Sequence, residues 1–247
     1  MLVRTARYNL FFPKVSNLRR KAFEIEETLS PYFTSVTLIP IPDDAPEEIP
    51  RIATSSHNGH STLNISLTNA QISTSYDEKF ERDWESCLSY LKERVFQISN
   101  VLSSYIEGDF LFSGLTTEIV FDDLGENTPL ELIKTRFLNY KGAQEPYDLE
   151  YKMTFVVDDS YYVNITFSNM RIYEGIHQAG AGIMQFSELQ ETANLLGVVV
   201  DINNRFAFNH KKDHHSSQDS IEKIFEITYG LLDSRLKKMI EEGEVEI

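Results

Sequence analysis

Short segments in which apolar and polar side chains alternate recur along the first third of the chain, and this period of two predicts strands with one buried face. Two of these segments flank Asn69, an arrangement typical of a β-hairpin. A third is rich in β-branched residues and ends at Pro40 and Pro42, because proline has no N–H for a strand to pair. The predicted strands of this region are residues 3–12, 33–41, 63–68 and 70–76.

Two long segments carry apolar residues at spacings of three and four, which predicts amphipathic helices. The first covers residues 80–105 and the second covers residues 217–242 near the end of the chain. Two shorter helices are predicted over residues 17–30 and 128–140, the latter because Thr128, Pro129 and Glu131 form a helix-start signature. The inner positions of the first long helix are Phe80, Trp84, Leu88, Leu91, Val95, Ile98 and Leu102.

The second half of the chain repeats this order of elements. A glycine-containing connection over residues 175–186 leads to a short helical piece that begins at Ser187. The strands predicted for this half are residues 110–121, 149–157, 161–168, 170–177, 195–202 and 205–209.

Residues 63–72 and 163–172 match by identity or close chemistry at most positions, which suggests that one hairpin was used twice. We therefore predict an α+β fold made of two related halves, residues 1–108 and 109–247, each an antiparallel β-sheet packed against a long amphipathic helix. This order resembles the helix-grip arrangement of START-like proteins and the duplicated halves of TATA-binding-protein-like folds. One continuous domain and a chance match of β-branched segments are the alternatives.

The pattern of the whole chain carries a further resemblance. It consists of an N-terminal strand, residues 63–91 (LNISLTNAQISTSYDEKFERDWESCLSYL), and residues 198–210 (VVVDINNRFAFNH) followed by the terminal amphipathic helix. In these features the chain resembles a sporadically distributed bacterial protein family of roughly this length with no assigned function. The resemblance covers nearly the full length of the chain and brings no catalytic residues.

Charge argues against nucleic acid as a partner. The chain has 38 acidic and 23 basic residues and a formal net charge of −15, which repels phosphate backbones unless a basic face is segregated. The basic clusters are short and lie beside carboxylates, so we interpret them as solvated surface: residues 19–21, 211–212 and 237–238. Residues 39–50 are rich in proline and predict a stiff, acidic surface loop.

Cysteine content and hydropathy bear on location. The one cysteine, Cys87, cannot form an internal disulfide, which favours a reducing cytoplasm. We expect no signal peptide, because the first residues lack a long apolar run and a cleavage site. No apolar stretch approaches the roughly 20 residues of a membrane span, so no membrane partner is expected.

Histidines are the first candidates for metal chemistry. His210, His214 and His215 form an H-x-x-x-H-H cluster that could share a metal, but Lys211 and Lys212 would repel a cation there. His57 and His60 are too isolated to complete a site. We predict no metal site and no cofactor, with the first cluster as a weak candidate.

Other reactive groups have simpler interpretations. Cys87 lies on the apolar side of the first long helix, where burial favours an inert thiol. The glycines at 175, 180 and 182 lack the basic residue of a phosphate cradle. The carboxylate pairs could gather into an acidic cluster, although turn formation is the simpler and preferred interpretation: residues 43–44, 122–123 and 158–159.

Aromatic residues are the remaining candidates, with 16 Phe, 12 Tyr and one Trp. Tyrosines that crowd the second-half strands, Tyr151 and Tyr161 among them, indicate a core edge or a protein interface. The main hypothesis is a non-enzymatic cytoplasmic binding protein that associates with a protein partner or with itself. It could be an accessory subunit of a bacterial defence or toxin-neutralising system. One alternative is a metal-dependent enzyme using the carboxylates or late histidines. Another is a helix-grip pocket for a small ligand, lined by Phe80, Trp84, Tyr162, Tyr173 and Phe225.

Overall fold

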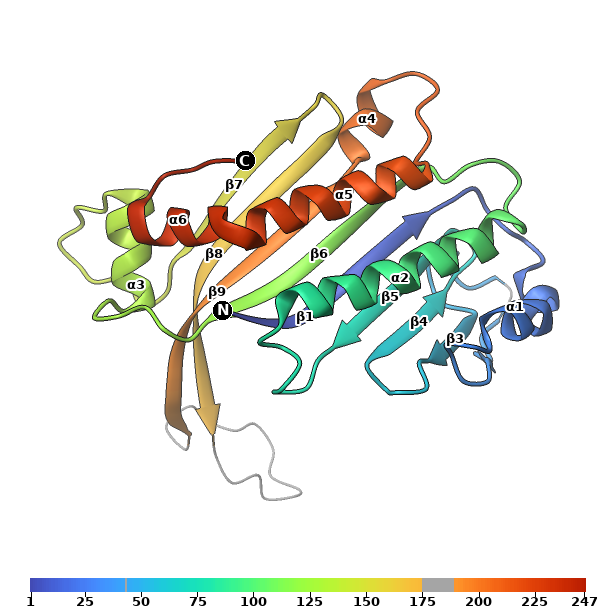
Figure 1. Cartoon of the computed structure of the whole chain (residues 1–247), viewed down its shortest axis with the longest axis horizontal. Helices are drawn as coiled ribbons and strands as arrows, with labels where there is room; N and C mark the ends of the chain where they lie inside the picture. The colour runs from blue at the N-terminus through green and yellow to red at the C-terminus, as the bar shows by residue number, and fades with distance from the viewer. Residues whose placement is uncertain (43, 175–188) are drawn as a thin grey trace.

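One antiparallel sheet organises the chain in a computed structural model that describes residues 1–42, 44–174 and 189–247 (Figure 1). Within these residues the strand order is β2-β3-β4-β5-β1-β6-β9-β8-β7. The strands are β1 (Leu2–Phe11), β2 (Thr37–Leu38), β3 (Ile52–Ser55), β4 (Ser61–Ile65), β5 (Asn69–Ser75), β6 (Phe112–Phe121), β7 (Glu150–Val157), β8 (Tyr161–Glu174) and β9 (Gln190–Asn203).

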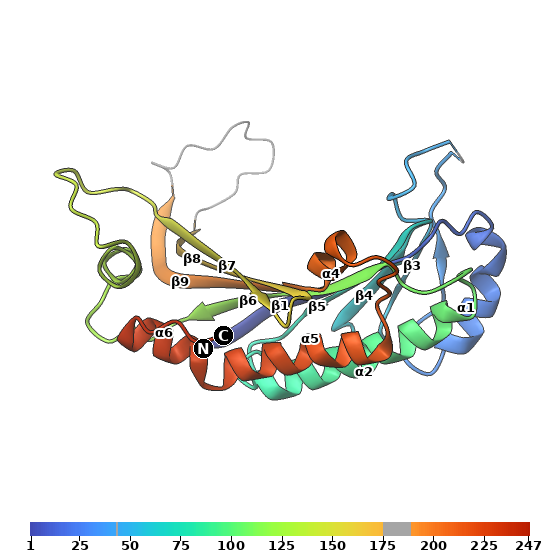
Figure 2. The ribbon, with the colours of Figure 1, turned by 90° about the horizontal axis from the view of Figure 1, so that it is seen from above.

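Two long helical elements lie along one side of the sheet and a short helix lies on the other (Figure 2). The first side carries α2 and the continuous run α5, η4 and α6, whereas α4 lies on the opposite side. The helical elements are η1 (Leu18–Lys21), α1 (Ala22–Leu29), α2 (Trp84–Ser103), α3 (Pro129–Leu132), η2 (Ile133–Leu138), α4 (Arg205–His210), α5 (Gln218–Gly230), η4 (Leu231–Arg235) and α6 (Leu236–Glu242).

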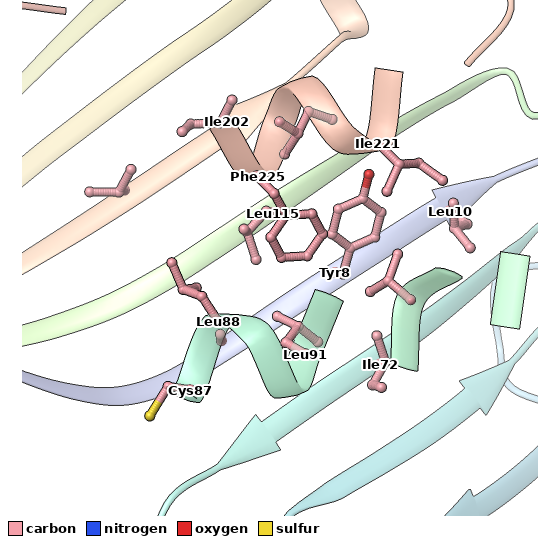
Figure 3. Close-up of a cluster of buried hydrophobic side chains, with 14 of the residues drawn as sticks. Tyr8, Leu10, Ile72, Cys87, Leu88, Leu91, Leu115, Ile202, Ile221 and Phe225 are labelled. Carbon is pink, nitrogen blue, oxygen red and sulfur yellow. The ribbon is translucent and has the colours of Figure 1, made fainter. Parts of the chain in front are cut away.

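The core fills the space between the two long helices and the sheet. Leu88 and Leu91 of α2 meet Phe225 of α5 over the central strands (Figure 3). The Phe225 ring stacks on Tyr8 with ring centroids 5.6 Å apart. The Tyr8 hydroxyl donates to Ser113 Oγ at 3.0 Å, so the buried polar tip of this tyrosine has a partner.

In the first half of the chain the structure confirms some predicted elements and shifts the bounds of others. The hairpin around Asn69 forms between β4 and β5. The first long helix begins later than predicted, because Asp83 accepts a hydrogen bond from the Ser86 N–H and caps the helix there. Phe80 therefore precedes the helix. The strand predicted over residues 33–41 is reduced to β2, with prolines at 40 and 42.

Two predictions for the second half are wrong. Residues 161–174 form one strand instead of two, because the backbone of Asn169 stays paired with Leu196 of β9. The match between residues 63–72 and 163–172 is thus not a repeated hairpin. Residues 205–210 form helix α4, since Asn204 leaves the sheet and its side chain accepts a hydrogen bond from the Ser113 N–H at 2.7 Å.

The remaining predictions of this half have mixed outcomes. The capping box at Thr128 is present, but the helix that it starts soon widens into the π-type segment η2. The last helix is confirmed as the run from α5 to α6. The glycine connection and the helical piece predicted from Ser187 fall largely outside the described residues.

The two halves of the chain share one sheet, whereas the sequence predicts a sheet in each half. Strands β1 and β6 pair with each other from Phe11 and Phe112 to Leu2 and Val120. The sheet consequently continues across the predicted boundary after Gly108. Among the described residues no helix is both long enough and apolar enough to cross a membrane.

Candidate functional site: the open face of the sheet

The side of the sheet that carries α4 is polar over most of its width, and we call it the open face. Strand alternation produces it, because neighbouring residues of one strand point to opposite sides. In β1, for example, Tyr8 and Leu10 are buried under the helices, whereas Arg7 and Asn9 lie on the open face. The side chains there are mainly Ser, Thr, Asn and Gln.

Strand register arranges these side chains in rows that cross the sheet. The first row is rich in amides and contains Asn64, Gln71, Asn9, Gly114, Asn203 and Tyr162. The second row lies two residues along each strand and contains Thr62, Ser73, Arg7, Thr116, Asp201, Asn164 and Thr154. Both rows pass from the first half of the chain to the second.

Hydrogen bonds hold the side chains of the two rows in place. The carboxylate of Asp201 accepts from Asn164 Nδ2 at 2.9 Å, from Asn203 Nδ2 at 3.1 Å and from Thr116 Oγ1 at 3.3 Å. Gln71 Nε2 donates to Asn9 Oδ1 at 3.0 Å. A partner that binds these groups therefore meets side chains that have already lost part of their conformational freedom.

A glycine is required where the first row crosses the centre of the sheet. A Cβ atom on Gly114 would lie 2.7 Å from Asn203 Cβ and 3.2 Å from the carbonyl oxygen of Ile202. Any larger residue at this position would push β6 and β9 apart. The absence of a side chain at Gly114 thus leaves space for Asn203 in the first row.

Aromatic rings gather at one end of the open face, and we call them the aromatic cluster. Phe11 and Phe112 stack with centroids 4.2 Å apart, and Phe208 of α4 lies 5.1 Å from Phe112. The Arg205 guanidinium lies 5.6 Å from the Phe112 centroid, a cation–π distance. Phe208 remains 38% exposed, so the cluster presents apolar surface to solvent. Phe206, Tyr162 and His210 extend it along α4.

Strands β8 and β9 extend beyond β7 as a two-stranded arm. The last residue of β8 that pairs with β7 is Ser168, and the arm then turns toward the α4 side of the sheet (Figure 2). Met170 and Ile172 are 37% and 39% exposed, and Leu195 and Ala193 lie opposite them. These four residues form an apolar stripe that continues the open face.

The five residues predicted to line a ligand pocket lie in separate places. Phe225 is in the core, and Phe80 packs against His60, Tyr76 and Tyr90. Trp84 lies 5.7 Å from the ring of Tyr229. The structure therefore does not bring the five together between helix and sheet.

The two tyrosines of that set are on the second-half strands. Tyr162 lies on the open face, where its ring meets Phe206 edge-on at 5.3 Å. Tyr173 lies on the arm, and its hydroxyl shares a 2.7 Å hydrogen bond with the Tyr147 hydroxyl. That hydrogen bond is the main reason that the pKa of Tyr173 is raised to about 12.

Trp84 does border a cleft at the far end of the long helices. The cleft has a volume of about 580 Å³ and lies between the first residues of α2, the loop before α3 and the end of the last helix. Its apolar lining consists of Met1, Trp84, Phe121, Leu124, Leu132, Leu232 and Ile240.

The late histidines do not converge. The His210 ring packs on Phe206 at 4.4 Å, and His215 Nδ1 lies 3.8 Å from Asp109 Oδ2. His214 is partly buried, which lowers its pKa, and its Nε2 has no hydrogen-bond partner among the residues that the structure describes. Among the described residues no group of three or more His, Cys, Asp or Glu side chains is placed to hold a metal ion.

The carboxylate pairs and the cysteine occupy structural positions. Asp158 and Asp159 have φ values of 52° and 46° in the turn between β7 and β8, which supports the turn interpretation. Asp122 accepts from the N-terminal amine and from Arg82. Cys87 is buried, and burial raises the pKa of its thiol to about 12. Asp43 and the glycines at 175, 180 and 182 lie outside the described residues.

Sequence reasoning missed most of the open face. Asn9, Gln71, Asn203 and Phe112 were not among the candidates, although Asn9, Gln71 and Phe112 stand at alternate positions of predicted strands and Asn203 directly follows one. The usable signal was the run of Asn, Gln, Ser and Thr at those positions. What could not be foreseen was which strands would be neighbours.

A scan against protein-family models finds none that matches this chain, and a search of the curated proteins finds no match either. The functional interpretation accordingly rests on the geometry of the open face.

Proposed function

We propose that this chain is a non-enzymatic binding protein that holds a partner protein on the open face of its sheet. The observation that carries the proposal is the pair of pre-ordered polar rows that cross the sheet beside the aromatic cluster. Polypeptides offer the amide donors and acceptors that such rows can pair with, and exposed aromatic rings supply apolar contact area.

The aromatic cluster and the apolar stripe support the same proposal. They provide apolar surface at two separate places, the α4 end of the open face and the arm. Interfaces are commonly built from apolar anchors together with polar groups that fix register. On the open face Arg7 pairs with Glu118 at 2.8 Å and the carboxylate of Asp201 lies in the second row, so this surface does not favour a phosphate backbone.

We infer in addition that the two halves of the chain derive from one duplicated unit, in the manner of helix-grip or TATA-binding-protein-like folds. In each half the first strand lies at the centre of the sheet and the later strands follow outward in reverse chain order: β1-β5-β4-β3 in one half and β6-β9-β8-β7 in the other. Each half also ends with a long helix on the same side of the sheet. On this proposal the two halves contribute equivalent strands to the open face.

The role that we propose in the cell is that of a cytoplasmic accessory subunit, for example in a bacterial defence or toxin-neutralising system. The acidic composition and the free thiol of Cys87 support this role. The family resemblance described above also agrees with it.

A matched pair of surface variants tests the main proposal. Thr62 and Thr154 are exposed at opposite ends of the second row, and Thr28 is exposed on α1, away from the open face. Partners are captured from the native host with the wild type, with Thr62→Arg/Thr154→Arg and with the control Thr28→Arg. We expect a protein that the wild type and the control retain and the double variant loses.

The captured protein is then purified and bound to the wild type, and hydrogen exchange is measured on the complex. Protection should appear in β1, β5 and β6. A partner that binds the double variant as tightly as the wild type would overturn the proposal, as would protection confined to α2 and α5.

The cleft beside Trp84 favours a second function, the binding of a small apolar ligand. Trp84 is the one tryptophan of the chain, so its fluorescence reports on this cleft alone. A saturable change in emission with an apolar probe such as 8-anilinonaphthalene-1-sulfonate, lost in Leu124→Arg, would support that function. An unchanged emission spectrum would argue against it.

A further inference from the structure

A cleft in the first half of the chain concentrates positive charge in an otherwise acidic protein. It has a volume of about 600 Å³ and lies between the β1–η1 connection, the β4–β5 turn and the residues that lead into β3. The residues that line it are Lys14, Ser16, Asn17, Arg19, Arg20, Arg51 and Leu67. Four of these side chains are cationic, whereas the net charge of the chain is −15.

Arg51 is the unusual member of this set, because it is only 2% exposed. Its guanidinium donates to the carbonyl oxygens of Ile49 at 2.7 Å, Ala45 at 2.9 Å and Pro46 at 3.3 Å. In the part of the chain that the structure describes, no carboxylate forms an ion pair with it. A buried charge without a counter-charge is costly, and an anion in the adjoining cleft would supply one.

The other cationic side chains of the cleft differ in whether they already make hydrogen bonds or ion pairs. Lys14 Nζ lies 2.6 Å from a carboxylate oxygen of Glu47, and Arg19 donates to the carbonyl oxygens of Ile39 and Ile41. The Arg20 side chain is exposed and makes no hydrogen bond or ion pair within the described residues. Arg20 is therefore the group that can turn toward a bound anion.

We propose that this cleft binds a compact phosphorylated anion. Guanidinium groups match the oxygens of a phosphate in bidentate geometry, and several cations in one cleft suit an anion with more than one negative charge. Leu67 is the one apolar residue of the lining, so the cleft offers little surface for a nucleobase. The volume falls in the range of small-molecule sites and exceeds what a lone phosphate needs. Pyrophosphate and phosphorylated polyols have this chemistry.

Calorimetric titration of the full chain with inorganic pyrophosphate tests this site. We expect saturable binding at one site, weakened by about tenfold or more in Arg20→Ala because a charged hydrogen bond is lost. Arg20→Lys should restore part of the affinity. Lys237→Ala removes an exposed lysine on α6 and should bind as the wild type does.

Two results would overturn the proposal: no saturable heat at millimolar pyrophosphate, or equal affinity of Arg20→Ala and the wild type. ATP serves as a comparison. Binding of ATP much tighter than that of pyrophosphate would show that a nucleoside is recognised and would refute the compact ligand.

Thermal unfolding gives a second readout of the same site. Pyrophosphate should raise the Tm of the wild type, since a ligand that binds only the folded state stabilises it, and should raise that of Arg20→Ala less. An equal rise in both proteins would contradict the site. The variants at Thr62 and Thr154 leave this cleft intact, so the anion site and the partner surface can fail independently.

Discussion

The two faces of the sheet are built from the same strands but differ in burial and polarity. One face is apolar and covered by helices, whereas the other is polar and open to solvent. On the helix side, Tyr8, Leu115 and Ile202 are closed off by α2 and α5, and substitutions there should cost folding free energy. On the open face, Asn9 is held by a hydrogen bond from Gln71, and Thr116 and Asn203 both donate to Asp201, while this side of the sheet stays within reach of a partner. Because neighbouring residues of a strand point to opposite sides, one residue contributes to the core and the next residue is available for binding a partner.

The largest effect is expected on the helix side. Leu91 of α2 is fully buried in the core, so Leu91→Ala should lower the free energy of unfolding by about 2–5 kcal/mol, from lost burial and the cavity that remains. Urea denaturation monitored by circular dichroism measures this loss. A change below about 0.5 kcal/mol, the usual range of a surface substitution, would mean that the α2 stripe does not form the core.

A smaller loss is expected for a buried hydrogen bond on the same side. Tyr8→Phe keeps the stack on Phe225 but removes the donor to Ser113 Oγ. The net cost should be about 1 kcal/mol, and Ser113 keeps its contact with Ser216. Equilibrium denaturation of Tyr8→Phe beside wild type checks the value, and a gain in stability would refute the role of this hydrogen bond.

The cap of α2 should make stability depend on pH. Hydrogen bonds from the side chain and backbone of Ser86 lower the pKa of Asp83 in the folded state. Stability from this group is therefore present above the ordinary aspartate pKa and is lost as pH falls through the lower, folded-state pKa. The Tm difference between the wild type and Asp83→Ala should shrink as the pH is lowered through this window. A difference that stays constant with pH would contradict the assignment.

The smallest effect on stability is expected on the open face. Thr62→Arg/Thr154→Arg should change the free energy of unfolding by no more than about 0.5 kcal/mol per site, because both side chains are exposed. Partner binding should nevertheless be lost. If the double variant unfolds more easily by several kcal/mol, the contrast between the two faces is wrong.

Local patterns were sufficient to predict many elements of the fold. The hairpin around Asn69, the capping box at Thr128 and the two long helices follow from side-chain period and helix-start chemistry, which act over a few neighbouring residues. The buried stripe of α2 is also confirmed from Leu88 to Leu102. These features depend on contacts within one element or between adjacent elements.

Errors arose where long-range pairing overrode the local pattern. Asn169 looked like a turn between two strands, yet pairing with Leu196 carries β8 straight through it. Residues 205–209 looked like a strand, but β9, the strand directly before them, is already paired on both sides, with β6 and β8, and they form α4 instead. The five residues predicted to share a pocket were each plausible aromatic candidates. They lie apart because the fold places them on different elements, which the sequence pattern does not reveal.

The sequence alone determined the α+β class, the amphipathic helices and the acidic composition, because each is a property of composition or of residues close in the chain. Tertiary structure decided that β1 and β6 join the two halves into one sheet, and this pairing brings Asn9 and Asn203 into one row. It also decided that the buried Arg51 and the exposed Arg20 line the same cleft. Such juxtapositions depend on which distant segments become neighbours, and side-chain periodicity carries no information about that choice.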